Sequence, residues 1–423
     1  MQREENVSST TRRGFLAASA AVGTMAAMGT NFAHAQGSDI LKVGVIGCGG
    51  RGSGAAGDCI NGAKAAGAQV QITAVGDAFA EKAKGIAGKH KLPDNKVFAG
   101  IDAYKGVIDS GVDMVILATP PGFRPYHFKA AIEAGKHVFF EKPVAVDPVG
   151  VRMVMAAAEM ADQKKLAVVA GTQRRHELPF QETIKRLHDG AIGDLLYMRV
   201  HWDGGGIWYR PRKEGMSDVE YQMNNWYHYV WLCGDQICEQ HVHNLDVAQW
   251  VLGGPPTSAY AQGGRAVRDS VGQKPGQIHD HCAVLFEYPN GVNLWSTCRH
   301  WPGDGAGGEY VVGSKGSANP GGGFTVRGGE SFKAPKAPVS AYVQEHTDLI
   351  ASIKAGKPLN EGKQVAISTM MAIMGRMSAY TGKKVSWDFA LNKSQLNTMP
   401  ANLDMKGSMP EPDVAIPGKE KLI

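Results

Sequence analysis

An apolar segment that runs directly into a glycine-rich turn is the feature that most constrains the fold of this chain. Residues 42–46 have the composition of a buried strand, and the string that follows at once contributes Gly47, Gly49, Gly50 and Gly52. A stretch rich in small residues at 54–68 predicts a helix packed closely on the sheet. A second strand is predicted at 70–75 and leads to Asp77. Strand, glycine turn, helix and a following acid together predict a dinucleotide-binding unit.

The residue types of this turn suit a dinucleotide. Glycines let the backbone turn tightly and approach a pyrophosphate, and the helix N-terminus offers unpaired N–H groups to the negative charge. Asp77 stands where a carboxylate accepts hydrogen bonds from the adenosine ribose hydroxyls, and it would repel a 2′-phosphate. NAD is therefore favoured over NADP. Arg51 keeps NADP as an alternative, because its guanidinium could pair with a phosphate or stack on adenine.

Further strands alternate with helices along the first half of the chain. Strands are predicted at 113–118, 137–140 and 166–170, with a helix at 126–134 and another that begins after Asp147-Pro148. This alternation predicts an α/β fold with a doubly wound parallel sheet. The first of these strands ends in Thr119-Pro120 and the second in Glu141-Lys142-Pro143. Lys142 then lies where nicotinamide and substrate should meet, as a proton-transfer or substrate-orienting group.

The pattern changes after residue 175. A helix at 180–188 is followed by long alternating strands at 195–202, 282–288 and 292–299, and Asn290-Gly291 is a strong hairpin signal. We expect a Rossmann domain at 38–175 and an α+β substrate-binding and oligomerisation domain at 176–387, with a large, mostly antiparallel open sheet. Helices at 344–355 and 363–380 should pack back on the first sheet. Residues 388–423 are polar and contain several prolines, which predicts an extended arm that could wrap a neighbouring subunit.

A polar face on a later segment is a candidate for acid–base chemistry. Residues 239–250 are predicted to be helical, which places Glu239, His243 and Asp246 on one face. The alternative is a histidine hydrogen-bonded within a polar interface. Between residues 204 and 229 the chain is rich in glycine and aromatic residues, Tyr209 among them. Such residues suit stacking on sugar faces, core filling or a subunit interface.

The N-terminus has the order of features of a twin-arginine signal peptide. Arg12-Arg13 is followed by a weakly apolar stretch at 17–28 and by Ala33-His34-Ala35, a small-x-small cleavage site. Residues 1–35 are therefore expected to direct export to the periplasm, with no stable membrane anchor after cleavage. Free nicotinamide nucleotides are scarce there, so an exported dinucleotide enzyme should hold its cofactor tightly.

Composition excludes some other classes. The formal net charge of +5 is small for 423 residues and no Lys/Arg block is present, so we expect no nucleic-acid partner. Six cysteines are scattered without a Cys-x-x-Cys pair, which predicts free buried thiols with Cys233 and Cys238 the pair to examine. The pairs His241/His243 and His279/His281 lack a diagnostic ligand spacing, so no metal is predicted.

From about Lys42 to Trp387 the sequence resembles the Gfo/Idh/MocA family of nicotinamide-dependent sugar and polyol oxidoreductases. The matching strings are Gly47-x-Gly49-Gly50-x-Gly52, Asp77, Thr119-Pro120, the run 134–138, Glu141-Lys142-Pro143 and His243-x-x-Asp246. The resemblance implies that Lys142 and His243 lie at the active site. The family commonly has aspartate where this chain has Glu239, and His241 is a neighbouring candidate.

The resemblance also implies a mechanism and an assembly. A sugar hydroxyl would give its proton to His243 or Lys142 while the adjacent carbon gives hydride to nicotinamide. Arg174 and His176 are expected to line the sugar or cofactor pocket, with Arg174 the substrate clamp. Family members are commonly dimers or tetramers through the open sheet, so a homodimer or homotetramer is expected.

Three functions compete on this sequence. The first is a periplasmic oxidoreductase that acts on a sugar, glycoside or polyol with firmly bound NAD or NADP, like the exported glucose–fructose oxidoreductases. The second is a redox-neutral glycoside hydrolase or lyase of the NAD-dependent N-acetylgalactosaminidase type, in which the lysine of Glu-Lys-Pro is not kept. The third is a non-catalytic sugar-binding protein. Lys142 ranks the first above the second, and the intact glycine turn and His243 argue against the third.

Overall fold

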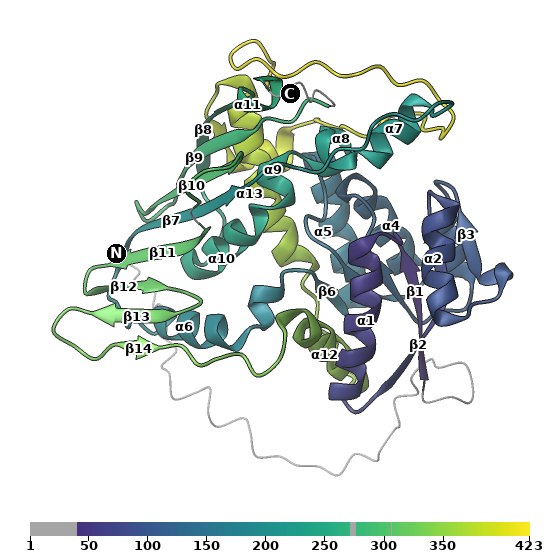
Figure 1. Cartoon of the computed structure of the whole chain (residues 1–423). Coiled ribbons are helices and arrows are strands. Elements are labelled where there is room, and N and C mark those ends of the chain that lie inside the picture. Colours follow the sequence, from purple (N-terminus) through teal and green to yellow (C-terminus); the bar gives the residue numbers. More distant parts are fainter. Residues whose placement is uncertain (1–39, 271–275, 306) are drawn as a thin grey trace, which may run out of the picture. The chain divides into compact units, whose positions relative to one another are not determined.

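The first half of the chain builds the predicted parallel sheet (Figure 1). The computed structural model describes residues 40–270, 276–305 and 307–423, so the predicted leader at 1–35 lies outside the described residues. Six strands run in the order β3-β2-β1-β4-β5-β6 and all pair in parallel. They are β1 (Ile40–Ile46), β2 (Gln69–Asp77), β3 (Val97–Ala99), β4 (Met114–Leu117), β5 (His137–Phe140) and β6 (Val168–Ala170). The order reverses between β1 and β4, where doubly wound sheets form a ligand-binding crevice.

Helices connect these strands, and their ends follow local signals. They are α1 (Gly50–Ala65), α2 (Ala80–His90), α3 (Ala103–Asp109), α4 (Arg124–Glu133) and α5 (Pro148–Gln163), with short turns η1 (Asp94–Lys96) and η2 (Pro121–Phe123). As predicted, Asp147 caps α5, and its carboxylate accepts the Gly150 N–H at 2.7 Å. The helix predicted at 54–68 instead begins at Gly50, because the glycine turn is itself its first turn.

The second half forms the predicted large open sheet. Its order is β14-β13-β12-β11-β7-β10-β9-β8-β15, and of these pairs only β7 with β10 is parallel in the described residues. The strands are β7 (Leu195–Gly204), β8 (Ser258–Gly264), β9 (His281–Glu287), β10 (Asn293–His300), β11 (Gly307–Gly313), β12 (Gly316–Asn319), β13 (Gly323–Val326), β14 (Phe332–Lys333) and β15 (Val385–Ser386). The predicted hairpin at Asn290-Gly291 joins β9 to β10, with Gly291 at φ +80°.

Helices of the second half cover one face of this sheet and reach back to the first. They are α6 (Leu178–His188), α7 (Asp218–Asn224), α8 (Val230–Cys233), α9 (Gln236–Glu239), α10 (Val242–Leu252), α11 (Val267–Ser270), α12 (Ala341–Lys354) and α13 (Gly362–Thr381), with the turns η3 (Gln173–His176), η4 (Trp226–His228) and η5 (Phe389–Lys393). A Cβ on Gly62 of α1 would lie 2.8 Å from the Thr347 nitrogen of α12. This close approach confirms that α12 packs back on the first sheet's helices.

The prediction of one helix at 239–250 is wrong. The chain forms α9 and α10 as separate helices, with Gln240 and His241 between them. His241 turns inward, and its Nε2 lies 2.7 Å from the Ser296 hydroxyl in β10. Glu239 therefore shares no helical face with His243 and Asp246.

The C-terminal segment, predicted as an extended arm, packs on its own chain, and a contact with a neighbouring subunit stays a prediction. The Gln222 side chain of α7 donates to the carbonyls of Met409 and Pro410 at 3.2 and 3.3 Å, and the Tyr229 hydroxyl donates to the Glu411 carboxylate at 3.0 Å. Apolar side chains contribute to this packing, because the segment adds several to the cluster around α7 and α8: Met399, Leu403, Met405 and Met409.

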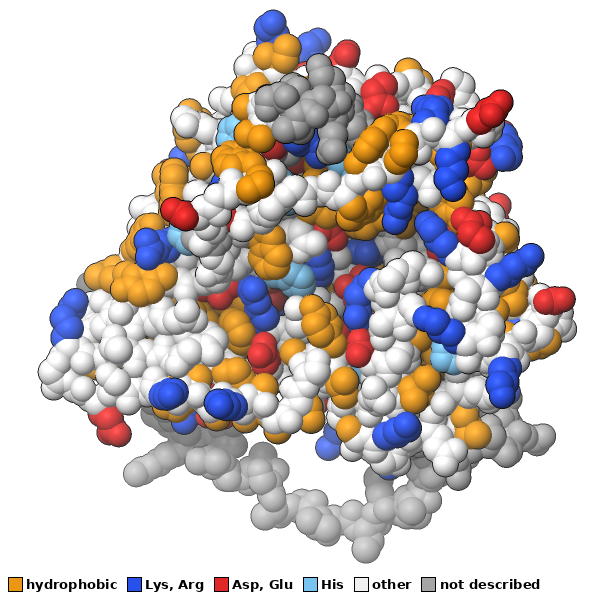
Figure 2. All heavy atoms as spheres, viewed as in Figure 1, with side chains coloured by type: hydrophobic (Ala, Val, Ile, Leu, Met, Phe, Trp, Pro, Cys, Tyr) orange, Lys and Arg blue, Asp and Glu red, His pale blue; other side chains and the backbone are white. Residues whose placement is uncertain are grey.

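The remaining sequence expectations concern thiols, membranes and charge. All six cysteines are free and buried, as predicted. Among the described residues, no helix combines the length and apolar character needed to cross a bilayer. Figure 2 shows acidic and basic side chains interspersed over the visible face, so the small positive net charge is not gathered there.

Candidate active site

A cavity of about 370 Å³ opens at the carboxyl ends of β1, β4 and β5 and is closed on its other side by the second half of the chain. Its lining includes most residues predicted to bind cofactor and all three predicted catalytic residues: Gly47, Gly49, Gly50, Arg51, Asp77, Thr119, Pro120, Glu141, Lys142, Glu239 and His243. The structure thus brings together residues from both halves of the chain, among them Gly47 after β1 and His243 of α10.

The glycine turn has two kinds of glycine. A Cβ on Gly47, which has φ +94°, would lie 2.5 Å from the Thr119 nitrogen, and one on Gly52 would lie 1.9 Å from the Gly47 carbonyl oxygen. At these two positions the absence of a side chain lets the backbone of the turn pack directly against neighbouring backbone. Gly49 and Gly50 would meet nothing within 4 Å and face the cavity at the start of α1. They leave room for a phosphate at a helix N-terminus.

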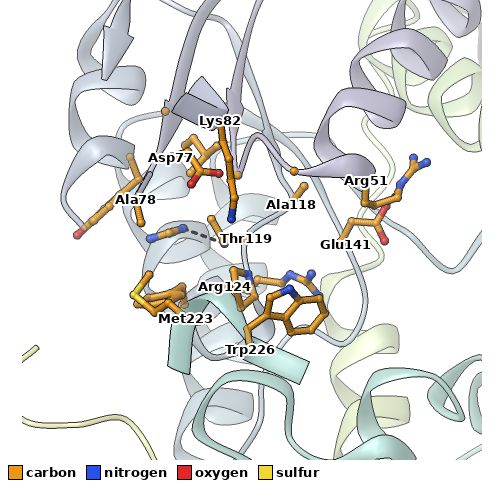
Figure 3. A pocket seen from close by; sticks show the side chains of 18 of the residues that line it. Arg51, Asp77, Ala78, Lys82, Ala118, Thr119, Arg124, Glu141, Met223 and Trp226 are labelled. Atoms are coloured by element: carbon orange, nitrogen blue, oxygen red, sulfur yellow. Dashed lines mark hydrogen bonds and ion pairs between the residues drawn. The ribbon is translucent and has the colours of Figure 1, made fainter. Parts of the chain in front are cut away.

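Asp77 is held at the tip of β2. Its carboxylate accepts the Cys48 N–H at 2.7 Å and the Phe79 N–H at 2.9 Å. Lys82 of α2 also lines the cavity, and Figure 3 shows its side chain beside Asp77. Burial lowers the pKa of Lys82, although the Asp77 charge opposes this. The open glycines and this fixed carboxylate fit the diphosphate and ribose of a dinucleotide.

The Arg51 guanidinium forms ion pairs with two carboxylates. Its Nε donates to Glu141 at 2.5 Å, and its Nη2 donates to Asp58 at 3.0 Å. The guanidinium also lies 5.0 Å from the centre of the Tyr342 ring. Burial lowers the pKa of Arg51, but the combined charges and hydrogen bonds of Glu141, Glu345 and Asp58 outweigh burial, so the pKa is raised. Arg51 is thus already paired with two acids, which weakens the sequence argument for NADP.

Lys142, Glu239 and His243 converge at the opposite part of the cavity. The Lys142 ammonium donates to the Glu239 backbone carbonyl at 2.5 Å and lies 3.4 Å from its carboxylate. Burial, reinforced by the charges of Lys142 and Arg174, lowers the pKa of His243 well below its ordinary value. The imidazole is therefore neutral at pH 7 and can accept a proton. A cation fixed by a carboxylate beside a neutral base suits proton transfer from a hydroxyl.

The residues predicted to contact substrate lie outside this lining. Arg174 donates to Glu309, and His176 lies 2.7 Å from Asp348 and 3.2 Å from Glu361. Burial lowers the pKa of His176, but its hydrogen bonds to the two acids outweigh burial and raise it to about 10. Both side chains thus join charged clusters within the chain.

The other three residues are also engaged elsewhere. Asp246 accepts from Arg175 at 2.8 Å and from Ser368 at 2.7 Å, so its carboxylate turns away from the cavity. His241 binds Ser296, as described above, and the Tyr209 hydroxyl accepts from Tyr221 at 3.4 Å. The substrate roles expected for these five residues stay predictions.

Sequence reasoning missed several lining residues. Arg124 begins α4 just beyond the carboxyl end of β4, a position that the rule for parallel sheets would have flagged. Trp226 and Met223 belong to the aromatic-rich stretch whose role was left open. Tyr342 of α12 had no signal, because only the folded chain brings residue 342 to the cavity.

The fold and the site define a class, a Rossmann dinucleotide-binding protein with a second, open-sheet domain. Residues 41–172 match the model of the oxidoreductase family with an NAD-binding Rossmann fold, and residues 180–319 match that of the GFO/IDH/MocA C-terminal domain. The chain belongs to the Gfo/Idh/MocA oxidoreductase family.

Individual relatives agree with this assignment. Inositol 2-dehydrogenase of Rhizobium meliloti is 25% identical over 224 residues, which cover 53% of this chain and 59% of that protein. The chain spans about half the length of the other curated relatives it matches. The structure of aldose-aldose oxidoreductase from Caulobacter crescentus, with glycerol, matches with a TM-score of 0.62 and 19% identity, over 82% of this chain and 99% of that one. A levoglucosan dehydrogenase solved with NADH and levoglucosan matches with a TM-score of 0.63 and 17% identity, over the same shares.

Proposed function

We propose that this protein is a periplasmic oxidoreductase that uses tightly bound NAD to oxidise a hydroxyl group of a sugar, glycoside or polyol. The observation that carries the proposal is the convergence of Lys142, Glu239 and neutral His243 in one cavity with the glycine turn and Asp77. The relatives named above, which act on inositol, aldoses and levoglucosan by their names, support this substrate class. The twin-arginine pattern supports the location and the captive cofactor.

In this proposal different residues of the chain bind the cofactor and transfer the proton. Gly49, Gly50 and the start of α1 hold the diphosphate, and Asp77 holds the adenosine ribose. NAD supplies the hydride acceptor when bound. His243 accepts the proton of the substrate hydroxyl, because burial keeps its imidazole neutral. Lys142, fixed by Glu239, orients the same hydroxyl oxygen and stabilises the negative charge that develops on it.

The first experiment tests cofactor and chemistry together. The protein is purified after export by its own leader and denatured, and the released nucleotide is identified by absorbance and mass. The refilled or intact protein is then assayed with myo-inositol, glucose and a glucoside while nicotinamide absorbance is followed. We expect near-stoichiometric NAD(H) and a substrate-dependent change in its redox state. A protein without nucleotide refutes the captive cofactor. A nucleotide that no sugar or polyol reduces, with cleavage of the glucoside, indicates redox-neutral glycoside cleavage.

We propose that the protein is a homodimer or homotetramer through the outer face of the second sheet. A row of directly paired residues crosses five strands on one face: Tyr260, Leu285, Trp295, Arg199 and Tyr310. Three of them are exposed aromatic residues, Tyr260 at 47%, Trp295 at 40% and Tyr310 at 38%. Such a row is typical of a subunit interface. Light scattering on the Trp295→Glu variant tests it, and an unchanged mass would exclude this face.

A further inference from the structure

Arg124 is a buried cation in the cavity that the mechanism above does not use. It begins α4, lines the cavity and is 4% exposed. Its Nη1 donates to the Pro143 carbonyl at 2.6 Å, which ties it to the loop that carries Lys142. Its Nε is buried and has no hydrogen-bond partner among the residues that the structure describes. A buried guanidinium with an unsatisfied N–H is costly unless something completes its hydrogen bonds.

No carboxylate in the described lining accepts a hydrogen bond from the Arg124 guanidinium. Of the three acids in the lining, Asp77 is bound by backbone amides, Glu141 by Arg51 and Glu239 by Lys142. Within the described parts of the chain, no ion pair of 4.0 Å or less joins Arg124 to an acid.

The lining residues by themselves include one more cation than carboxylates. The described lining carries four cations, Arg51, Lys82, Arg124 and Lys142, against three carboxylates. Burial lowers the pKa of Arg124 to about 10, even though Glu141 and Glu239 oppose this, and the group is still charged at pH 7. Asp58, which lies outside the lining, also pairs with Arg51, so the charges balance overall, and it is the buried Nε of Arg124 that lacks a partner among the described residues.

Its position indicates which part of a bound complex would supply the anion. Figure 3 places Arg124 next to Trp226, on the side of the cavity away from Asp77 and Lys82. The diphosphate is expected at Gly49 and Gly50, where the start of α1 faces the cavity. Arg124 instead lies against the loop of Lys142, at the end where the substrate should bind.

We propose that Arg124 binds a carboxylate of the substrate, so that the natural substrates are sugar acids, uronates or aldonates. This rests on the proposed oxidoreductase function and names its substrate class. Nη1 is taken by Pro143 and Nε is buried without a partner among the described residues, so the unsatisfied N–H lies on the edge that Nε shares with Nη2. Two parallel N–H groups on one edge match the two oxygens of a carboxylate. A neutral sugar offers only hydroxyl oxygens, which accept uncharged and single hydrogen bonds, so the site favours the acid over the neutral sugar.

The test compares matched substrates on the cofactor-loaded protein. Glucuronate and gluconate are assayed against glucose and against glucose 6-phosphate, for the wild type and for Arg124→Gln and Arg124→Lys. Arg152→Gln is the matched control, because Arg152 of α5 donates to the Leu391 carbonyl and does not line the cavity. Calorimetric titration of glucuronate and of glucose gives binding without turnover.

We expect the wild type to prefer a sugar acid over glucose in kcat/KM and in affinity. Arg124→Gln should reduce this preference about 10- to 100-fold, the effect of losing hydrogen bonds to a charged group, and Arg124→Lys should restore part of it. Arg152→Gln should leave the preference unchanged.

Several outcomes would overturn the inference. Glucose oxidation without turnover or binding of sugar acids refutes it while the proposed function stands. A preference for glucose 6-phosphate assigns another anion to the site. If Arg124→Gln weakens NAD binding by the same factor as kcat/KM, Arg124 holds the cofactor instead. Failure of every sugar and polyol to react refutes the proposed function itself.

Discussion

Removing the Lys142 ammonium should damage both stability and turnover, and the two losses can be separated. The side chains of Lys142 and Glu239 are 9% and 8% exposed, and their charged atoms lie 3.4 Å apart. Coulomb's law at an effective dielectric of 20 gives this pair an attraction of about 5 kcal/mol. The Lys142→Met variant leaves the Glu239 carboxylate buried without its cation, which costs about 3–5 kcal/mol.

The size of the protein converts this loss into a melting shift. With an unfolding entropy of about 2.1 cal/mol/K per residue, a chain of this length loses about 1 °C for each kcal/mol, so the Tm should fall by about 3–6 °C. Calorimetry on the cofactor-loaded protein measures it. Turnover should fall about 10²- to 10⁴-fold, since the group that orients the reacting hydroxyl is gone.

A second variant separates the two effects. In Lys142→Met/Glu239→Gln the unpaired charge is removed as well, so most of the lost Tm should return while turnover stays low. The control is Lys406→Met, which breaks the exposed ion pair between Lys406 and Glu220 and should cost less than about 1 kcal/mol. A single variant that melts within 1 °C of wild type by calorimetry would refute the buried-pair argument. So would a double variant as unstable as the single one.

Three further changes test the cofactor end and a charged cluster. Gly52→Ala should abolish dinucleotide binding, measured by fluorescence titration, because the new Cβ would lie 1.9 Å from the Gly47 carbonyl oxygen. The control is Gly57→Ala on the same helix, whose Cβ would meet nothing within 4 Å, so this variant should bind the dinucleotide normally. Asp77→Asn should lower the NAD/NADP affinity ratio at least about tenfold, because the charge that repels a 2′-phosphate is removed; an unchanged ratio contradicts that role. Burial lowers the pKa of His176, but its hydrogen bonds to Asp348 and Glu361 outweigh burial and raise the folded pKa to about 10. The charged imidazole therefore stabilises the folded protein fully below the unfolded pKa near 6.5, and this stabilisation is lost as pH rises through about 10. The Tm difference between wild type and His176→Asn should therefore shrink from pH 6.5 to 10, and a constant difference would contradict the assignment.

Local sequence was enough to predict the first sheet and its cofactor end. The glycine turn, Asp77 and the strand that leads to Lys142 are read from neighbouring residues, because a parallel strand and the turn at its end are built from one short segment. The hairpin at Asn290-Gly291 was predictable for the same reason, since Gly291 adopts a positive φ that few other residues tolerate.

The second wall of the cavity was not predictable in this way. Helical periodicity placed Glu239 and His243 on one helix, whereas the structure has two helices, and His241 between them is buried against Ser296. The predicted substrate residues Arg174 and His176 pair with Glu309, Asp348 and Glu361, all more than 100 positions away, and no local pattern reveals such partners.

The sequence by itself determined the class of the protein: two domains, a dinucleotide turn, a lysine at the mouth of a parallel strand and the family to which these belong. Only the tertiary structure decided which charges remain free in the cavity. Arg51 forms ion pairs with Glu141 and Asp58, whereas Arg124 forms no ion pair with an acid among the described residues. The physical reason is that a charge is neutralised by whichever opposite group folding brings within a few ångströms, and that distance is set by packing between segments far apart in the chain.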